Sequence, residues 1–236
     1  MARVAGLLAL ALVPHPAQAQ AQAQECRLAL LLALDVSASV DGREYALQRD
    51  GLAAALNDPD IRRALLQGRA PVALAAYEWS GRYQQAVILP WRLLDSPGAI
   101  DHAVARIAAA QRSHEGFPTA AGYALGYGAG LLREAPACDR EVIDVSGDGV
   151  NNEGFAPGLA YENFPFDGVT VNGLAISGSD AGVIAFYTGE LAFGPGAFVE
   201  VAEGFADFRR AMTLKLFREL NDMRLGRGGE VPECCG

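Results

Sequence analysis

The sequence predicts an α/β protein with a single, doubly wound, mostly parallel sheet that has one antiparallel edge strand and helices on both faces. Strand-like apolar runs alternate along the chain with helix-like segments, which is the order of a parallel sheet with crossover helices. Residues 28–34 are apolar at every position, as in a central strand that is buried on both faces. The chain has 236 residues, 51% of them hydrophobic, which is enough for one substantial core.

The helix after the first strand has a well-marked start and end. Asp41 is suited to cap a helix that begins near Gly42, and Glu44 completes a capping box. The Asn-Asp-Pro sequence at 57–59 ends this helix. Later strands are expected at 72–79 and 85–91, which form a hairpin through 80–82, and at 141–146, 169–176 and 197–202. Later helices are expected at 97–111, 119–133 and 205–220.

The helix expected at 119–133 carries three glycines at intervals of four residues. Gly122, Gly126 and Gly130 therefore share one face of the helix. Each lowers the stability of the helix by about 1 kcal/mol relative to alanine. We expect this face to let the helix approach the sheet closely.

The first 24 residues have the pattern of a signal peptide. Arg3 supplies a positive start, residues 4–13 form a short apolar run, and Ala-Gln-Ala repeats at 17–23 offer cleavage sites. The apolar run is too short to span a membrane. We therefore expect a mature domain at 25–236 that is periplasmic or secreted and does not insert into the membrane after signal removal.

The charge of the chain excludes nucleic acid as a partner. The formal net charge is −9, and Lys215 is the single lysine among 19 basic residues. The sequence has no basic stripe of the kind that binds phosphate backbones. Its acidic character also disfavours docking on anionic membranes.

The four cysteines are expected to meet an oxidising compartment. Cys26, Cys138, Cys234 and Cys235 allow three full pairings, and none has the spacing of a metal site. Cys26 lies two residues before the first strand, and Cys138 lies three residues before the strand at 141–146. If these strands are parallel neighbours, both cysteines lie at the same edge of the sheet. This favours a Cys26–Cys138 disulfide and leaves the adjacent pair undecided.

Five oxygen-bearing side chains lie at strand ends or helix starts. Asp35, Ser37 and Ser39 follow the first strand, Asp148 follows the strand at 141–146, and Thr119 begins a helix. Ligand sites of open α/β sheets lie at the carboxyl ends of strands, where the strand order reverses. Two carboxylates and three hydroxyls suit a hard divalent cation, Mg²⁺, with Mn²⁺ or Ca²⁺ as alternatives. The sequence therefore predicts a metal site with an open position.

The same residues also have simpler interpretations. Ser37 and Ser39 are suited to cap the following turn, Asp148 to an ordinary turn, and Thr119 to a helix N-cap. Asp144 lies within its strand, where we expect a hydrogen-bonded structural carboxylate rather than a ligand. The aromatic residues at 151–168 form either a rim that contacts a partner or a self-packed loop, which we favour; they are Phe155, Tyr161, Phe164 and Phe166.

The order and spacing of these motifs resemble the von Willebrand factor type A (vWA) domain and its metal-ion-dependent adhesion site. The resemblance rests on "DVSASVD" and "VIDVSGDGVNN", and more loosely on "GFPTAAGYAL", and it covers about residues 26–222. One departure is the Glu78-Trp79 pair that ends "AAYEWSG" in the place of the second strand. The chain resembles an exported bacterial branch of unknown function. The resemblance implies a vWA/Rossmann-like fold and metal ligation by Asp35, Ser37, Ser39, Thr119 and Asp148.

Enzyme classes with a similar first strand do not match. A haloacid-dehalogenase-like phosphatase needs an aspartate at the position of Ser37 and a phosphate-binding lysine, whereas Lys215 lies in the last helix. No G-x-S-x-G, H-E-x-x-H or P-loop motif occurs. We therefore predict a non-enzymatic module that recognises a protein partner through the metal, with an acidic residue of the partner completing the site. The alternatives are a metal-dependent periplasmic hydrolase of the phosphatase type, or a structural metal with recognition elsewhere.

Overall fold

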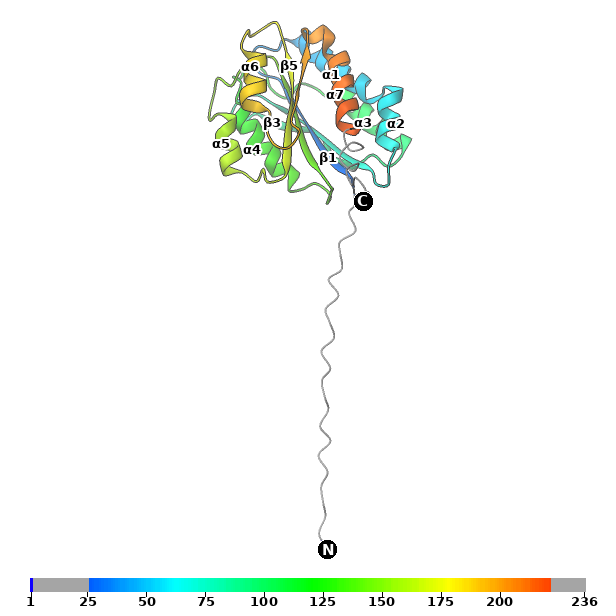
Figure 1. The fold of residues 1–236 in the computed structure, drawn as a ribbon. Coiled ribbons are helices and arrows are strands. Elements are labelled where there is room, and N and C mark those ends of the chain that lie inside the picture. The colour runs from blue at the N-terminus through cyan, green and yellow to red at the C-terminus, as the bar shows by residue number, and fades with distance from the viewer. Residues whose placement is uncertain (2–25, 222–236) are drawn as a thin grey trace, which may run out of the picture.

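The computed structural model describes Met1 and residues 26–221, in which a six-stranded sheet lies between two layers of helices (Figure 1). The expected signal peptide, 1–24, and the cysteine pair at 234–235 lie outside the described residues, so both interpretations stay predictions. None of the helices in the described part of the chain is long and apolar enough to cross a membrane.

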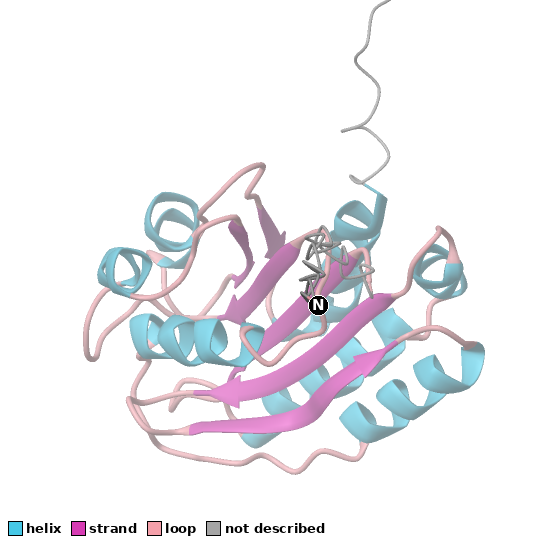
Figure 2. Ribbon diagram, turned by 90° about the horizontal axis from the view of Figure 1, so that it is seen from below, coloured by secondary structure: helices cyan, strands magenta, loops and turns pink. Residues whose placement is uncertain are grey.

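The strands have the order β3-β2-β1-β4-β5-β6, and β3 alone among them is antiparallel to its neighbour. Figure 2 shows the strands side by side with helices around them. This arrangement confirms the predicted fold class. The strands are β1 (Leu28–Asp35), β2 (Val72–Trp79), β3 (Gln85–Leu93), β4 (Glu141–Gly147), β5 (Val169–Ile176) and β6 (Val199–Ala202).

Two hydrophobic cores lie on the two faces of the sheet. Along β1, residues 28, 30, 32 and 34 contribute to one core and residues 29, 31 and 33 to the other, because successive side chains of a strand point to opposite faces. The first core is covered by α1 (Gly42–Leu56), α2 (Pro59–Leu66), α3 (Pro97–Ala108) and α7 (Phe208–Asn221). The second is covered by α4 (Ala121–Leu132), α5 (Pro157–Asn163), α6 (Val183–Phe186) and the π-helical turn η1 (Tyr187–Leu191).

The start of α1 follows the predicted capping box. Asp41 Oδ1 accepts hydrogen bonds from the backbone nitrogens of Arg43 at 2.7 Å and Glu44 at 2.8 Å, and Glu44 Oε2 accepts one from the nitrogen of Asp41 at 2.8 Å. The helix ends at Leu56, as the polar sequence at 57–59 predicted. We did not predict α2, which Asp58 caps and Pro59 begins.

The prediction that the glycine face of α4 lies against the sheet is wrong. A Cβ at Gly122 would overlap the backbone oxygen of Phe155, and one at Gly126 would lie 2.8 Å from the Phe164 ring. Gly130 faces open space. The glycines thus make room for the segment that follows β4. Gly128, outside the predicted face, is the residue that faces the sheet, with the Tyr77 hydroxyl 2.9 Å from a Cβ placed there.

The aromatic residues of 151–168 pack on one another and on neighbouring rings, as favoured above. Phe155 lies 4.3 Å from the Tyr123 ring and 6.1 Å from the Phe164 ring, and Tyr161 stacks on Phe193 at 4.1 Å between ring centroids. The segment is also not a loop throughout, because it contains α5.

The Cys26–Cys138 disulfide is confirmed. The two residues pair in parallel just outside the amino ends of β1 and β4, and their Cα atoms are 4.5 Å apart. The reason is the predicted one, since β1 and β4 are neighbouring parallel strands.

Candidate metal centre

The predicted metal residues lie where the strand order reverses. The chain places β2 and β3 on one side of β1, and β4, β5 and β6 on the other, so the carboxyl ends of β1 and β4 meet at the switch point of the sheet. Asp35 is the last residue of β1, and Asp148 directly follows β4. The loop between α3 and α4 brings Thr119 to the same edge of the sheet.

Hydrogen bonds and close contacts join all five residues. Ser39 Oγ donates a hydrogen bond to Asp148 Oδ1 at 2.7 Å and lies 3.3 Å from Ser37 Oγ. Thr119 Oγ1 donates to Ser37 Oγ at 3.2 Å. Asp35 Oδ1 accepts a hydrogen bond from the backbone nitrogen of Ser37 at 2.7 Å. We call this set of five residues the strand-end cluster.

The strand-end cluster is buried except on one side. Asp35, Ser37 and Asp148 are 0% exposed and Thr119 is 3% exposed, whereas Ser39 and its neighbour Ala38 are exposed. Access from solvent is therefore past Ser39.

Two carboxylate oxygens of the cluster lack a hydrogen-bond partner. Asp35 Oδ2 and Asp148 Oδ2 are buried and accept nothing from the protein. Burial raises the pKa of Asp35 to about 7; the hydrogen bonds from Ser37 lower it, the charge of Asp148 raises it, and Arg112 makes the smallest contribution, a lowering one. Unpaired buried carboxylates are costly unless a positive charge joins them. The donor set therefore fits a bound cation.

The structure shows which helix caps the hydroxyl residues do not form. The N-cap of α1 is Asp41, so neither Ser37 nor Ser39 caps this helix. The N-cap of α4 is Ala120, without a side-chain cap, so Thr119 does not cap it. The hydroxyl of Thr119 instead points into the cluster. Metal ligation by these residues stays a prediction.

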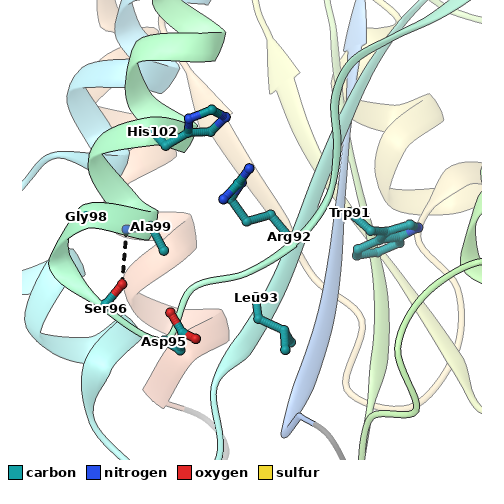
Figure 3. Close-up of a pocket in the computed structure, with 8 residues that line it drawn as sticks. All are labelled: Trp91, Arg92, Leu93, Asp95, Ser96, Gly98, Ala99 and His102. Atoms are coloured by element: carbon teal, nitrogen blue, oxygen red, sulfur yellow. Dashed lines mark hydrogen bonds between the residues drawn. The ribbon is translucent and has the colours of Figure 1, made fainter.

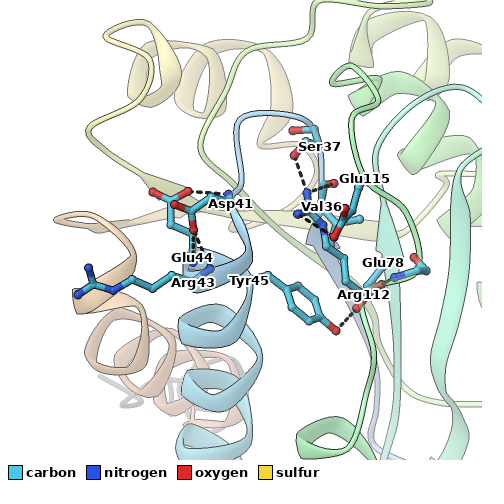
Figure 4. A network of polar contacts seen from close by, with 10 residues as sticks. Val36, Ser37, Asp41, Arg43, Glu44, Tyr45, Glu78, Arg112 and Glu115 are labelled. Atoms are coloured by element: carbon cyan, nitrogen blue, oxygen red, sulfur yellow. Dashed lines mark hydrogen bonds and ion pairs between the residues drawn. The ribbon is translucent and has the colours of Figure 1, made fainter.

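A polar network behind the cluster holds the loop after β1, and the sequence interpretation missed it (Figure 4). Arg112 Nη2 donates to the backbone oxygens of Val36 at 3.0 Å and Ser37 at 3.1 Å. The buried Glu78 accepts hydrogen bonds from the Tyr45 hydroxyl and the backbone nitrogen of Ser113, both at 2.7 Å. The sequence feature that could have indicated Glu78 is the Glu78-Trp79 pair in "AAYEWSG", which departs from the usual ending of the second strand in the family.

The residues after Asp148 hold Thr119 in place. Asn152 Oδ1 accepts a hydrogen bond from the backbone nitrogen of Thr119, and the nitrogen of Asn152 donates to the Thr119 oxygen, both at 2.9 Å. From α1, Gln48 Nε2 donates to the backbone oxygen of Asp35 at 2.9 Å. Each of these segments, which carry predicted ligands, is thus fixed by a neighbouring element.

Tyr187 is a further residue that the sequence did not indicate. A Cβ placed on Gly147 would lie 2.6 Å from the Tyr187 hydroxyl and 2.7 Å from Asp35 Oδ2, so both atoms border the same glycine. The Tyr187 hydroxyl is buried without a hydrogen-bond partner. Burial raises its pKa well above the usual value, and the charge of Asp35 raises it further. Gly147 leaves the space that this approach needs.

The cluster differs in composition from sites built on carboxylates, imidazoles and thiolates. Within residues 26–221 no group of three or more His, Cys, Asp or Glu side chains is placed to hold a metal. The strand-end cluster agrees with this finding because it has two carboxylates and takes its other oxygens from hydroxyls.

A separate open pocket of about 650 Å³ lies between β3 and α3 (Figure 3). Its polar side chains are spread along the walls, and Ser96 is engaged in capping α3 through the backbone nitrogen of Ala99 at 3.2 Å. None of the strand-end cluster lines it. The lining residues are Trp91, Arg92, Leu93, Asp95, Ser96, Gly98, Ala99 and His102.

Similarity to solved structures gives the class of fold. Proximal thread matrix protein 1 from the mussel byssus matches with a TM-score of 0.61 at 16% identity, over 82% of this chain and 49% of that chain. A von Willebrand factor type A protein from Catenulispora acidiphila matches with a TM-score of 0.60 at 14% identity, over 83% and 43%. The PilB minor pilin from Streptococcus sanguinis matches with a TM-score of 0.66 at 15% identity, over 88% and 64%. The protein has a vWA-like fold and spans about half the length of the first two chains.

The family follows from the sequence itself. Residues 25–224 match the family described as "Protein of unknown function (DUF1194)", and the chain belongs to this family. Comparison with curated proteins gives no match. A second structure of the mussel protein, 14% identical with a TM-score of 0.56 over 82% of this chain and 48% of that one, has a zinc-occupied MIDAS motif.

Proposed function

We propose that this protein is an exported vWA-like binding module that recognises an acidic residue of a protein partner through a divalent cation. The cation is held by Asp35, Ser37, Ser39, Thr119 and Asp148. The observation that carries the proposal is the pair of buried, unpartnered oxygens, Asp35 Oδ2 and Asp148 Oδ2, beside three hydroxyl oxygens.

The donor set favours Mg²⁺. All five side chains offer oxygen, which hard cations prefer, and a small ion needs few protein ligands because it keeps bound waters. Three of the donors are neutral hydroxyls, so the two carboxylates balance a divalent charge without excess. The zinc-occupied MIDAS motif of the mussel protein supports a divalent cation in a protein of this fold.

The exposed side of the cluster favours binding over turnover. The two histidines in the described residues do not join the cluster: His102 lines the pocket between β3 and α3, and His114 contacts Ser113 Oγ at 3.0 Å. Lys215 is buried with other partners. Because no histidine or lysine of residues 26–221 lies in the cluster to act as a general base or to hold a phosphate, an open position suits an incoming carboxylate better than hydrolysis.

The surface beside the opening offers a contact for the partner. The backbone nitrogen of Ala38 donates to the oxygen of Phe117 at 2.7 Å, which places this aromatic residue next to the opening. Phe117 is 37% exposed. Its ring is available to an apolar residue that flanks the acidic one.

Direct measurement of cation binding tests the metal step. Calorimetric titration of chelator-treated protein with Mg²⁺, Mn²⁺ and Ca²⁺ is expected to show one site, lost in Asp148→Asn and retained in the exposed control Asp139→Asn. Absence of binding for all three ions contradicts the proposal.

Capture from periplasmic extract tests the partner step. A partner retained with Mg²⁺ and released by chelator is expected to be lost with Thr119→Val and weakened by Phe117→Ala, which leaves cation affinity unchanged. Neutralising one acidic residue of that partner is expected to abolish binding. Cleavage of phosphate esters by the purified protein with Mn²⁺, lost in Asp35→Asn, would instead establish the hydrolase alternative.

A further inference from the structure

The loop between α3 and α4, which carries Thr119, depends on a small number of contacts for its position. Residues 109–120 form neither helix nor strand, and most of residues 111–118 are exposed. An exposed segment with few buried contacts is among the parts of a protein that open most easily. The place of the Thr119 hydroxyl relative to the other predicted ligands therefore depends on the groups that fasten this loop.

Arg112 belongs to this loop by its backbone and is bound to the loop after β1 by its side chain. Its Nη2 donates to the backbone oxygens of Val36 at 3.0 Å and Ser37 at 3.1 Å. The side chain is 11% exposed, and hydrogen bonds from a charged donor are about twice as strong as those between neutral groups. Arg112 thus joins the two loops that carry the three hydroxyls of the strand-end cluster.

The buried Glu78 fastens the backbone next to Arg112. Glu78 Oε2 accepts a hydrogen bond from the backbone nitrogen of Ser113, and Oε1 accepts one from the Tyr45 hydroxyl, both at 2.7 Å. Glu78 belongs to β2 and is 0% exposed, and Tyr45 belongs to α1. The segment from which Arg112 reaches the loop after β1 is therefore attached to both the sheet and a helix (Figure 4).

Divalent cations differ in how much they depend on such rigid placement. Mg²⁺ requires a nearly octahedral set of oxygens at about 2.0–2.1 Å, whereas Ca²⁺ accepts about six to eight oxygens at about 2.3–2.6 Å in a flexible arrangement. Neutral hydroxyls attract a cation less than carboxylates do, so they contribute only when they are held at the right distance. Rigidly held hydroxyls therefore favour Mg²⁺, and loops that move relative to one another favour Ca²⁺.

We propose that Arg112 is a positioning residue that raises the affinity of the strand-end cluster for Mg²⁺ relative to Ca²⁺. It acts through the backbone of Val36 and Ser37, to which it donates, and not as a ligand. By joining the two loops it holds the three hydroxyls at the spacing that the smaller ion needs. This inference rests on the proposed function, because it requires a cation at the strand-end cluster.

A purely electrostatic role of Arg112 would have the opposite consequence. Burial raises the pKa of Asp35 to about 7, and the charge of Arg112 opposes this rise slightly, so this charge reaches the cluster. A positive charge near the site repels any cation. Removal of the charge alone would therefore strengthen the binding of both ions, whereas loss of the fastening weakens the binding of Mg²⁺ most.

Calorimetric titration of chelator-treated variants with Mg²⁺ and with Ca²⁺ tests the proposal. Arg112→Met has no hydrogen-bond donor in its side chain, and we expect Mg²⁺ affinity to fall about 100-fold and Ca²⁺ affinity by less than about 10-fold, because outer groups that support ligands contribute this much. Arg112→Lys keeps a charged donor and is expected to recover part of the loss. The matched control is Arg106→Met, since Arg106 also donates to a backbone oxygen, that of Ile88 at 3.1 Å. This control is expected to keep both affinities.

The ratio of the two affinities separates positioning from a general loss of stability, which does not distinguish the ions. Glu78→Gln replaces one acceptor by a donor, is expected to shift the ratio in the same direction, and decides the question if Arg112→Met does not fold. An unchanged ratio, or stronger binding of both ions, overturns the inference and leaves the proposed function standing. If wild-type protein binds neither ion, the proposed function fails and the inference fails with it.

Discussion

Strand β4 and the residue that follows it each supply a buried aspartate to a polar cluster. The two aspartates differ in the groups that lie against their negative charge. Asp144, in the middle of the strand, meets Lys215, which α7 supplies at 2.8 Å. Asp148, just beyond the strand, meets Asp35 and three hydroxyls, and its Oδ2 has no partner. We call Asp144, Lys215, Glu219 and Asn172, none more than 2% exposed, the interior cluster; it includes a positively charged side chain, Lys215. None of the five side chains of the strand-end cluster is positively charged.

Their positions in the fold explain this difference. A helix packed on the face of a sheet can place a long basic side chain over it, and α7, which packs on β5 and β6, reaches Asp144 of β4 with Lys215. The carboxyl ends of the strands are instead followed by loops, which leave an approach from solvent past Ser39. A buried carboxylate with an internal cation stabilises the fold, and one that faces an opening is available to an external cation. Four experiments test this contrast.

Removing the internal cation is expected to have the largest effect. Lys215→Met leaves Asp144 and Glu219 buried without a positive partner, and loss of one member of a buried pair costs about 3–5 kcal/mol of unfolding free energy. Urea denaturation measures it. The exposed Arg209→Met on the same helix is expected to change stability by less than about 0.5 kcal/mol. An equal loss in both variants would show that the interior cluster makes no special contribution.

Neutralising a carboxylate at the strand end is expected to have the opposite sign in metal-free protein. Asp35→Asn removes a buried negative charge while keeping an acceptor for the backbone nitrogen of Ser37, so it is expected to raise the melting temperature in chelator. Wild-type protein is expected to gain about 2.7 kcal/mol with an ion at 100 times its dissociation constant. The variant loses this gain. Identical melting of wild-type protein with chelator and with each of Mg²⁺, Mn²⁺ and Ca²⁺ would remove the contrast between the clusters.

A hydroxyl deletion sharpens the comparison further. Thr119→Val keeps the shape of the side chain but removes the oxygen that contacts Ser37, and we expect cation affinity to fall about 100-fold, the upper end for groups that support a metal. Thr170→Val is the matched control, because Thr170 is also buried and its hydroxyl donates to the backbone oxygen of Pro195 at 3.1 Å. Calorimetric titration of both variants decides whether the Thr119 hydroxyl acts on the cation or only on stability.

The sequence predicted those parts of the molecule that depend on neighbouring residues. The strands, the capping box at Asp41 and the five residues of the strand-end cluster were all visible as local patterns. The disulfide followed from the expected pairing of two strands. A local pattern also misled: Asn57-Asp58-Pro59 ends α1, but the same aspartate and proline begin α2, since a capping residue followed by proline also marks a helix start.

The parts that the sequence did not predict depend on contacts between distant segments. The glycine face of α4 has the right spacing, but its partners, Phe155 and Phe164, come from the segment after β4. Arg112 and Tyr187 reach the strand-end cluster only because the topology brings their loops to it. Asp144 was expected to be structural, yet nothing local identified Lys215 as its counter-ion.

Tyr187 gives the smallest and most specific test of the strand-end cluster. Its hydroxyl and Asp35 Oδ2 both border Gly147, and neither has a hydrogen-bond partner within the protein. We expect Tyr187→Phe to lower cation affinity about 10-fold, because a polar group beside a predicted ligand is lost. Stability in chelator is expected to stay the same or rise, since the removed hydroxyl is buried and unpaired. Tyr77→Phe is the control: it removes a buried hydroxyl that donates to the Ala124 backbone oxygen at 2.8 Å. Tyr77→Phe is expected to lose stability and keep its cation affinity. If Tyr187→Phe instead lost stability and kept its cation affinity, the Tyr187 hydroxyl would lie outside the metal centre.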